Sequence, residues 1–227
     1  MSSNPLLNFE SNKLFYNKYL YKFVFNNSLA TIFRDKNFNY AKEVLDDLHH
    51  KAEKGEPLIR LSGYRHFNIT QTEFRECVSL YHELRSTSVD YKLRIENPCI
   101  HLYSNDKAWI LNLATKTEAA LEFWEPAPNV IKHLHPNVIL VKKHTGYDYK
   151  VTLGDFKVDA GFGKWIDNNL DKIKIGSIAR EHINNNGYCA NFYFYVRDER
   201  VLNLIKLIIA PSIRRIDKLV CKQDIDK

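Results

Sequence analysis

No segment of this 227-residue sequence has the pattern of a membrane anchor or a secretion signal, and we expect neither. No stretch approaches about 18 consecutive apolar residues, which excludes an ordinary membrane-spanning helix. The opening run Met1-Ser2-Ser3-Asn4-Pro5 has neither the basic start nor the apolar core of a secretion signal. We therefore expect a cytoplasmic protein that does not associate with membranes.

Glycine, proline and cysteine are scarce, with 8, 7 and 4 residues respectively. So few glycines and prolines argue against a long flexible linker. The cysteines never form Cys-x-x-Cys, so neither a zinc ribbon nor a disulfide framework is indicated. We interpret each as a small buried hydrophobic residue; they are Cys77, Cys99, Cys189 and Cys221. A glycine-rich phosphate loop is also missing, and we expect neither a cofactor nor a bound metal.

What the chain does contain is a pattern that occurs twice. Tyr-x-Tyr-Lys at positions 19–22 returns at positions 147–150. Residues 99–106 end in Asp106 before an apolar run, and residues 189–198 end in Asp198 before another. Both stretches read as an aromatic strand, an Asp at the N-cap and an amphipathic helix. Residues 58–63 also resemble residues 172–177. Three landmarks in the same order predict a duplicated domain, although their spacing differs.

The second copy reads as four strands and two main helices. We expect strands over residues 147–153, 172–175, 190–196 and 213–220, helices over 161–169 and 198–210, and a short extra helix over 178–185. Without the extra helix the order is βαββαβ. That is the ferredoxin-like arrangement, in which four antiparallel strands carry two helices on one face.

The first copy can be drawn in the same way. Its four strands are expected over residues 19–25, 58–61, 99–103 and 119–124, with 91–95 forming a hairpin with 99–103; the helices are expected over 40–53 and 107–114, with a helical insertion over 72–85. Residues 125–129, Glu-Pro-Ala-Pro-Asn, make a natural boundary. The predicted fold class is therefore α+β, with two tandem ferredoxin-like domains of mostly antiparallel strands over residues 1–129 and 130–227.

The net charge of +6 is distributed unevenly. Residues 1–129 contain 16 Lys and Arg against 16 Asp and Glu, whereas residues 130–227 contain 17 against 11. A basic domain beside a neutral one predicts that the second domain faces a polyanion. A basic surface that is merely solvated would give the same count.

Aromatic residues gather in the third strand of the second copy. Residues 187–196, Gly-Tyr-Cys-Ala-Asn-Phe-Tyr-Phe-Tyr-Val, resemble the third strand of RNA-recognition motifs (RRMs), which implies exposed rings that stack on bases. Alternate side chains share a face, so Tyr193 and Tyr195 lie opposite Phe192 and Phe194, and one pair belongs to the core. With the tyrosines outward, they would form a nucleic-acid-binding surface with basic residues, namely Lys142, Lys143, Lys150, Arg197, Arg214 and Arg215.

One further pattern carries possible catalytic chemistry. In His133-Leu134-His135 the two imidazoles share a face if the segment is a strand, as the binding of a divalent metal requires. Downstream, residues 147–150 fit Tyr-x-x-Lys. Together they resemble the motifs of rolling-circle replication initiators, the HUH nicking endonucleases. The resemblance implies that His133 and His135 bind the metal and that Tyr147 is the nucleophile.

Three functions are compatible with these patterns. The first is a nucleic-acid-binding protein, for RNA or single-stranded DNA, that uses the basic and aromatic second copy. The second is a protein without catalytic activity that binds a protein partner or its own copies. The third is the metal-dependent nicking endonuclease. The many Asn, Lys, Ile and Tyr residues are compatible with an AT-rich genome, such as that of a phage or mobile element.

Overall fold

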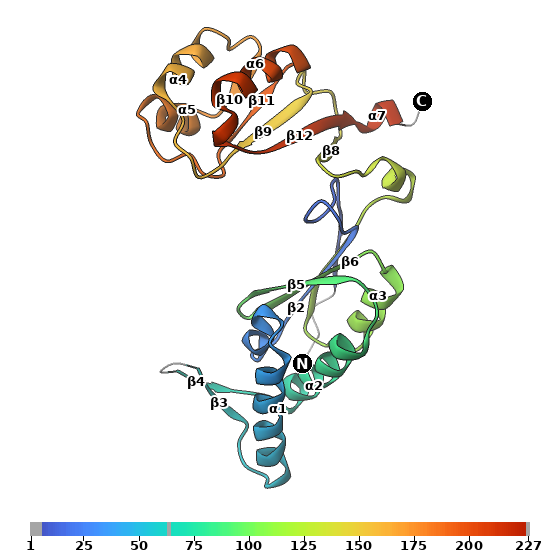
Figure 1. Cartoon of the computed structure of the whole chain (residues 1–227). Coiled ribbons are helices and arrows are strands. Elements are labelled where there is room, and N and C mark those ends of the chain that lie inside the picture. Colours follow the sequence, from blue (N-terminus) through green and yellow to red (C-terminus); the bar gives the residue numbers. More distant parts are fainter. Residues whose placement is uncertain (1–5, 63–64, 226–227) are drawn as a thin grey trace. The chain divides into compact units, whose positions relative to one another are not determined.

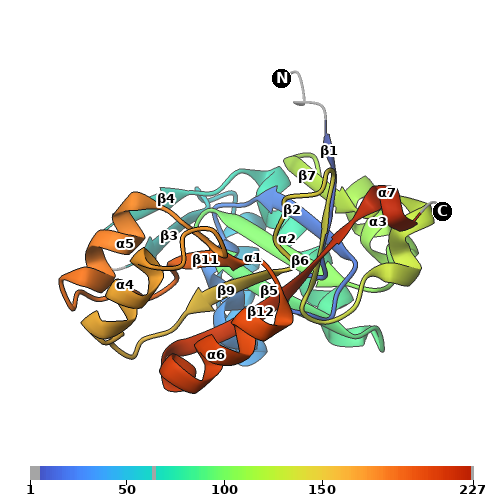
Figure 2. The ribbon, with the colours of Figure 1, turned by 90° about the horizontal axis from the view of Figure 1, so that it is seen from above.

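A computed structural model describes residues 6–62 and 65–225, and it divides the chain into two compact units. Unit 1 comprises the described residues up to Ser11 together with Lys18–Ala127, and unit 2 comprises Asn12–Asn17 together with the described residues from Pro128 onward. Both units mix helices with a five-stranded sheet (Figures 1 and 2), so the fold is α+β. In the described ranges no helix has the length and apolarity needed to cross a membrane.

Unit 1 has seven strands and four helical segments among its described residues. The strands are β1 Leu7–Glu10, β2 Tyr21–Asn26, β3 Ile59–Ser62, β4 Arg65–Asn68, β5 Tyr91–Glu96, β6 Cys99–Ser104 and β7 Ala120–Glu125. The helical segments are η1 Ala30–Lys36, α1 Phe38–Glu53, α2 Gln71–Ser86 and α3 Lys107–Thr115. The 16-residue helix α2 begins at a capping box, because Thr70 accepts from the Glu73 amide and the Glu73 carboxylate accepts from the Thr70 amide.

The main sheet of unit 1 has the strand order β1-β7-β2-β6-β5. All of its neighbours are antiparallel except the edge pair β1 and β7, which is parallel. Alternate residues of β2, among them Phe23 and Phe25, pack with Ile100 and Leu102 of β6 against α1, α2 and α3. One face of this sheet therefore carries the helices.

The second strand of unit 1 differs from the sequence-based expectation. Residues 58–61 were expected in the main sheet, but β3 pairs with β4 as a separate hairpin. Strand β5 occupies the edge next to β6 instead. The sequence cannot distinguish these two arrangements, because both segments are short strands that follow a helix.

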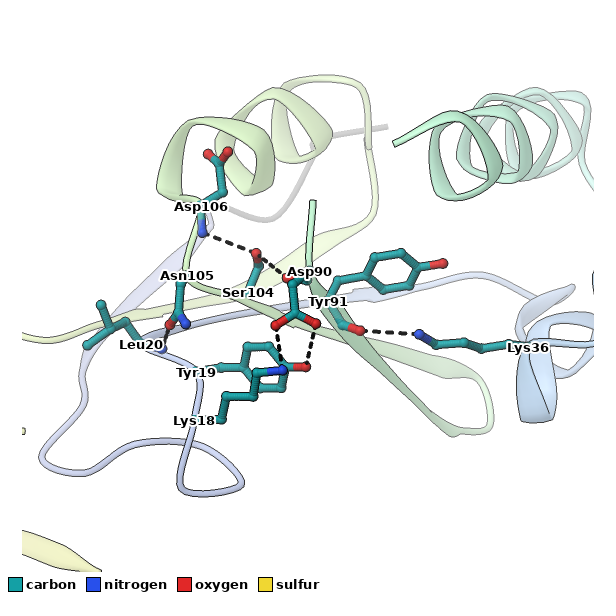
Figure 3. Close-up of polar contacts among 9 residues, drawn as sticks. All are labelled: Lys18, Tyr19, Leu20, Lys36, Asp90, Tyr91, Ser104, Asn105 and Asp106. Atoms are coloured by element: carbon teal, nitrogen blue, oxygen red, sulfur yellow. Dashed lines mark hydrogen bonds and ion pairs between the residues drawn. The ribbon is translucent and has the colours of Figure 1, made fainter. Parts of the chain in front are cut away.

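Polar contacts hold the chain where it enters β2 (Figure 3). The carboxylate of Asp90 forms an ion pair with the ammonium of Lys18 at 2.6 Å and accepts a hydrogen bond from the hydroxyl of Tyr19 at 3.3 Å. Nearby, the Leu20 amide donates to the side chain of Asn105 at 2.9 Å, and the Ser104 hydroxyl donates to the Asp90 carbonyl at 2.9 Å. Tyr19, the first residue of the repeated pattern, is buried in this network. Its role is to fix a strand end.

Among its described residues, unit 2 has five strands, which form one sheet. They are β8 Val138–Val141, β9 Tyr149–Leu153, β10 Ile173–Ile175, β11 Tyr193–Val196 and β12 Ile213–Cys221. The helical segments are η2 Pro128–His133, α4 Ala160–Asp167, α5 Ser177–Asn184, α6 Glu199–Ile209, η3 Ala210–Ser212 and α7 Lys222–Ile225. Helices α4 and α5 lie side by side (Figures 1 and 2), and their approach requires Gly163, where a Cβ would come within 1.9 Å of the Asn184 side chain.

The sheet of unit 2 has the order β10-β11-β9-β12-β8. Again every neighbouring pair is antiparallel except an edge pair, here β12 and β8. In each sheet the central strand, β2 or β9, is the one that precedes the first helix. The last strand, β7 or β12, lies beside it, and an added edge strand, β1 or β8, runs parallel to that last strand. Both sheets have this plan. In both, an Asp caps the last long helix, since Asp106 accepts from the Trp109 amide and Asp198 from the Val201 amide.

Candidate nucleic-acid interface

The two faces of the unit 2 sheet differ in what covers them. Val151, Phe194 and Val196 are fully buried, and they pack in one core with residues of α4, α5 and α6. Because side chains alternate along a strand, Lys150, Tyr193 and Tyr195 lie on the opposite face. In the expected choice between outward tyrosines and outward phenylalanines, the structure therefore places Tyr193 and Tyr195 outward and Phe194 in the core. We call the opposite face, with Tyr147, Lys150, Tyr193 and Tyr195, the tyrosine face.

The rings of the tyrosine face form a connected row. Tyr193 is 46% exposed, and its ring centroid lies 5.7 Å from that of Tyr195 in an edge-on arrangement. The Tyr195 centroid lies 6.3 Å from that of Tyr147, which precedes β9. The ammonium of Lys150 lies 3.9 Å from the centre of the Tyr193 ring. An exposed ring with a cation over one of its faces is suited to contact both a flat base and a phosphate.

Charged groups on the neighbouring strands surround Lys150. The register places it between Tyr195 of β11 and Asp217 of β12. Asp217 is 2% exposed, and its carboxylate binds the Nε atom of Arg215 at 2.9 Å. Burial lowers the pKa of Lys150, and the charges of Lys13 and Arg215 lower it further while Asp217 opposes them. Lys150 is therefore a partly desolvated cation, and an anion placed beside it would stabilise its charge.

The other expected binding residues lie around this face rather than on it. Arg214 occupies a bulge of β12 and donates to the Asn191 side chain at 2.5 Å. Arg197 is exposed one residue beyond β11, in the same alternation as Tyr193 and Tyr195. Lys142 and Lys143 follow the edge strand β8, which β12 and β9 separate from β11. The structure thus brings Lys150, Tyr193 and Tyr195 together and places the two lysines of the β8 loop apart from them.

The expected metal strand at His133-Leu134-His135 is not formed. Residues Pro128–His133 form the 3-10 helix η2, and β8 begins only at Val138. Prolines at positions 128 and 136 explain the difference, because proline favours the first turn of a helix and ends a strand. His135 is exposed, whereas the Nε2 atom of His133 is buried. The two imidazoles therefore do not share a strand face, and the ring of Tyr147 lies beside that of Tyr195.

On the equivalent face of unit 1, the corresponding side chains are buried or bound to one another. Lys22 has the position of Lys150, because it lies between Tyr103 of β6 and Trp124 of β7. Its ammonium binds Glu122 at 3.3 Å, and the indole of Trp124 donates to the same carboxylate at 2.8 Å. Tyr103 is only 5% exposed, and Phe9 stacks on Trp124 at a centroid distance of 4.6 Å. Glu122 of unit 1 has the position that Arg215 has in unit 2, two residues before the strand partner of the lysine. Both sheets therefore have a lysine at this place, but the charged residue beside it is acidic in unit 1 and basic in unit 2.

Besides Lys13, whose charge lowers the pKa of Lys150, sequence reasoning missed two charged residues of the tyrosine face. Asp217 is its buried carboxylate, Lys174 is opposite Tyr195 on β10, and Lys13 acts on Lys150 although residues 12–17 are far away in sequence. Strand pairing brings Asp217 and Lys174 to this face. For Asp217, the alternation of side chains along β12 is the sequence feature that could have indicated its place. Nothing in the sequence links Lys13 to Lys150, and Lys13 adds one more positive charge to unit 2.

Comparison of the chain with protein-family models, with curated protein sequences and with solved structures finds no match. A function for this chain is therefore inferred from the chemistry of its described side chains.

Proposed function

We propose that the tyrosine face of unit 2 binds single-stranded nucleic acid, RNA or DNA, in the cytoplasm. One observation carries the proposal: the half-exposed ring of Tyr193 lies on the helix-free face with the Lys150 ammonium 3.9 Å from its centre. A base would stack on Tyr193, and phosphates would contact Lys150, Arg197 and Arg214. Such stacking is tolerant of base identity, because every base has a flat face.

The proposal extends to the fold. We infer that each unit is a ferredoxin-like domain with one added edge strand. In support, the four antiparallel strands of each sheet have the order last, first, third, second, as in β12-β9-β11-β10 and β7-β2-β6-β5. RRMs use the helix-free face of this arrangement to stack bases on aromatic side chains. The tyrosine face has that location in unit 2.

The decisive experiment measures the fluorescence anisotropy of labelled single-stranded RNA and DNA with increasing full-length protein at several salt concentrations. We expect binding that weakens linearly on a logarithmic salt scale, because each neutralised phosphate releases counterions. Tyr193→Ala removes a stacking ring, which is worth roughly 1–3 kcal/mol, so affinity falls about 5- to 150-fold at every salt concentration. Lys150→Ala reduces the salt slope by about 0.7, the contribution of one phosphate contact on a single strand.

Two matched variants serve as controls. Tyr188 is 60% exposed and donates to Asp155, outside the tyrosine face, so Tyr188→Ala should leave affinity unchanged. Lys164 is exposed on α4, on the helix-bearing side of the sheet, so Lys164→Ala should leave the salt slope within about 0.2 of wild type. Binding that ignores salt, or that Tyr193→Ala and Tyr188→Ala weaken equally, would refute the proposal.

A second candidate function, self-association, is favoured by helix α6. Its outer face carries three exposed apolar side chains, Leu204, Leu207 and Ile208, and Leu207 is 83% exposed. Their spacing places them on one stripe of the helix. If copies of the chain associate through this stripe, light scattering after size exclusion will show a mass that rises with concentration, and Leu207→Lys will keep the protein monomeric. A single monomer mass at all concentrations would refute this alternative.

A further inference from the structure

Three potential metal ligands meet at one end of the unit 2 sheet. They are the imidazole of His144, the thiol of Cys221 and the carboxylate of Asp224, whose ligand atoms all lie within 4.8 Å of one another. His144 Nε2 and Asp224 Oδ1 are 3.3 Å apart. The three side chains line a pocket of about 360 Å³, which Tyr147 and Asp148 also border.

Strand pairing explains how distant residues converge here. Strands β8 and β12 are parallel, and Val141 is paired with Cys221 at their ends. Three residues beyond each end lie His144 and Asp224, so the two chains leave the sheet together and carry these side chains to the same edge. Helix α7 follows β12 directly, and a helical turn brings residue i+3 back beside residue i, here Asp224 beside Cys221.

The ligand set indicates which metal the site would select. Thiolate, imidazole and carboxylate together match zinc and similar borderline ions, whereas calcium and magnesium prefer oxygen ligands alone. Zinc bonds of about 2.0–2.3 Å in a tetrahedron place ligand atoms roughly 3.3–3.8 Å apart. The 3.3 Å between His144 and Asp224 already has that value. A zinc-bound thiolate lies about 3.5–3.7 Å from a nitrogen or oxygen ligand, so Cys221 Sγ, within 4.8 Å of both, needs to approach them by no more than about 1.3 Å.

We propose that His144, Cys221 and Asp224 bind a divalent ion of the zinc class, with water as the fourth ligand on the pocket side. Binding replaces the proton of the Cys221 thiol, which passes to solvent, by a bond from sulfur to the metal. Cys221 is 4% exposed, so the sulfur is protected from oxidation while the pocket admits the ion. The ion links the loop after β8 to α7 and so holds the last described helix on the sheet.

The test is a titration of untagged, full-length protein with Co²⁺ after treatment with a chelator. Tetrahedral cobalt with a thiolate ligand gives intense visible d–d bands and a sulfur-to-cobalt charge-transfer band in the near ultraviolet. We expect both at one ion per chain, and we expect Zn²⁺ to displace the cobalt and abolish them. Cys221→Ser should remove the charge-transfer band, and His144→Ala and Asp224→Asn should each weaken binding at least about tenfold.

Two control variants separate this site from other ligands of the chain. Cys189 is a second buried free cysteine of unit 2, and the ring of His182 contacts Phe192, so both lie outside the cluster. Cys189→Ser and His182→Ala should therefore keep wild-type cobalt spectra, and circular dichroism of all metal-free variants shows that each is folded. A charge-transfer band that survives Cys221→Ser, or wild-type protein that binds no cobalt, would overturn the proposal. Nucleic acid is not present, so this outcome is independent of the function proposed above.

Discussion

Neighbouring residues of β11 have opposite roles, and their contributions to stability should differ accordingly. Phe194 is fully buried, with its ring 5.9 Å from that of Phe162, whereas Tyr193 is half exposed. Phe194→Ala leaves a cavity in the core and should lower the free energy of unfolding by about 3–5 kcal/mol. Tyr193→Ala should lower it by less than about 1 kcal/mol. Urea denaturation followed by circular dichroism measures both, and equal losses would mean that Tyr193 is a core residue.

The sequence could predict the alternation of β11 but not its direction. Phenylalanine and tyrosine are both common in cores and at interfaces, so the residue types alone leave two orientations. The choice depends on which pair meets Val151 and the helices, which is a property of tertiary packing. For the cysteines the same limit applies in part. Cys77, Cys189 and Cys221 are buried as expected, but Cys99 is half-buried at the start of β6, where its thiol donates to Asn26.

His101 should make stability depend on pH. Its side chain is 12% exposed on the helix-free face of unit 1. Burial lowers its pKa, the charges of Lys22 and Arg94 lower it further, and Glu96 and Glu122 oppose them. A histidine with a lowered pKa in the folded state is protonated first in the unfolded chain. The free energy of unfolding therefore has its full value when the pH is above the pKa of histidine in the unfolded chain, about 6.5, and it decreases as the pH falls below that pKa.

The measurement compares urea midpoints of wild type and His101→Gln at pH values on either side of that window. Glutamine does not titrate, so the variant should lose less stability between neutral and mildly acidic pH than wild type does. The difference between the two proteins isolates His101 from the other histidines. Identical pH profiles would show that His101 takes up its proton equally in both states.

At the scale of elements, the aspartates that precede α3 and α6 are the most reliable landmarks of the repeat. Asp198 accepts the Val201 amide at 3.0 Å, as an N-cap does. Asp198→Ala should lower the free energy of unfolding of unit 2 by about 0.5–2 kcal/mol, because a helix amide loses its acceptor. Asp198→Asn keeps an acceptor and should change it by only a few tenths, about 0.3 kcal/mol. Urea unfolding followed by Trp165 fluorescence, in a background with Trp109→Phe and Trp124→Phe, measures these changes.

The equivalent variant of unit 1, Asp106→Ala, extends this test. Asp106 accepts the Trp109 amide at 2.9 Å, so its removal should lower the stability of unit 1 by a similar amount, about 0.5–2 kcal/mol. If Asp198→Asn were as damaging as Asp198→Ala, charge at the helix start rather than hydrogen bonding would be the stabilising factor.

Local signals predicted most elements, and long-range pairing accounts for the failures. Helices α1, α2, α3, α4, α5 and α6 lie within a few residues of the expected ranges, because each has an apolar stripe and most have a polar cap. Strand β3 was assigned to the wrong sheet, and β1 and β4 were missed. A strand's partner depends on residues far along the chain, so a short strand does not reveal whether it joins the main sheet.

For the whole molecule, the repeat is best expressed as a shared strand plan with different surfaces. Lys22 and Lys150 have the same cross-strand position, yet Glu122 neutralises the first, whereas the second lies over an exposed ring. The counts of basic and acidic residues predicted that the second half of the chain is more basic than the first. They did not predict which side chains beside the two lysines carry the difference. The cluster of His144, Cys221 and Asp224 was not predictable either, because only the parallel pairing of β8 with β12 joins residues so distant in sequence.

Residues 12–17 belong to unit 2 although the chain before and after them belongs to unit 1. The Leu140 amide donates to the Asn12 carbonyl at 2.8 Å, and the Asn17 side chain donates to that of Asn137 at 2.8 Å. Asn17 and Asn137 both have a left-handed backbone, with φ of 58° and 60°. Asparagine tolerates this conformation, whereas alanine does not. A single residue near the start of the chain should therefore affect the stability of unit 2.

Asn17→Ala removes a surface hydrogen bond and adds backbone strain, so it should destabilise unit 2 by about 1–2 kcal/mol. Asn17→Gly relieves the strain and should cost less, about 1 kcal/mol or below. Trp165 is the only tryptophan of unit 2, so its fluorescence in a Trp109→Phe, Trp124→Phe background reports urea unfolding of that unit alone. In the reverse background, Trp165→Phe, Trp109 and Trp124 should report an unchanged unit 1. A shift of the unit 1 transition without one in unit 2 would place residues 12–17 in the other unit.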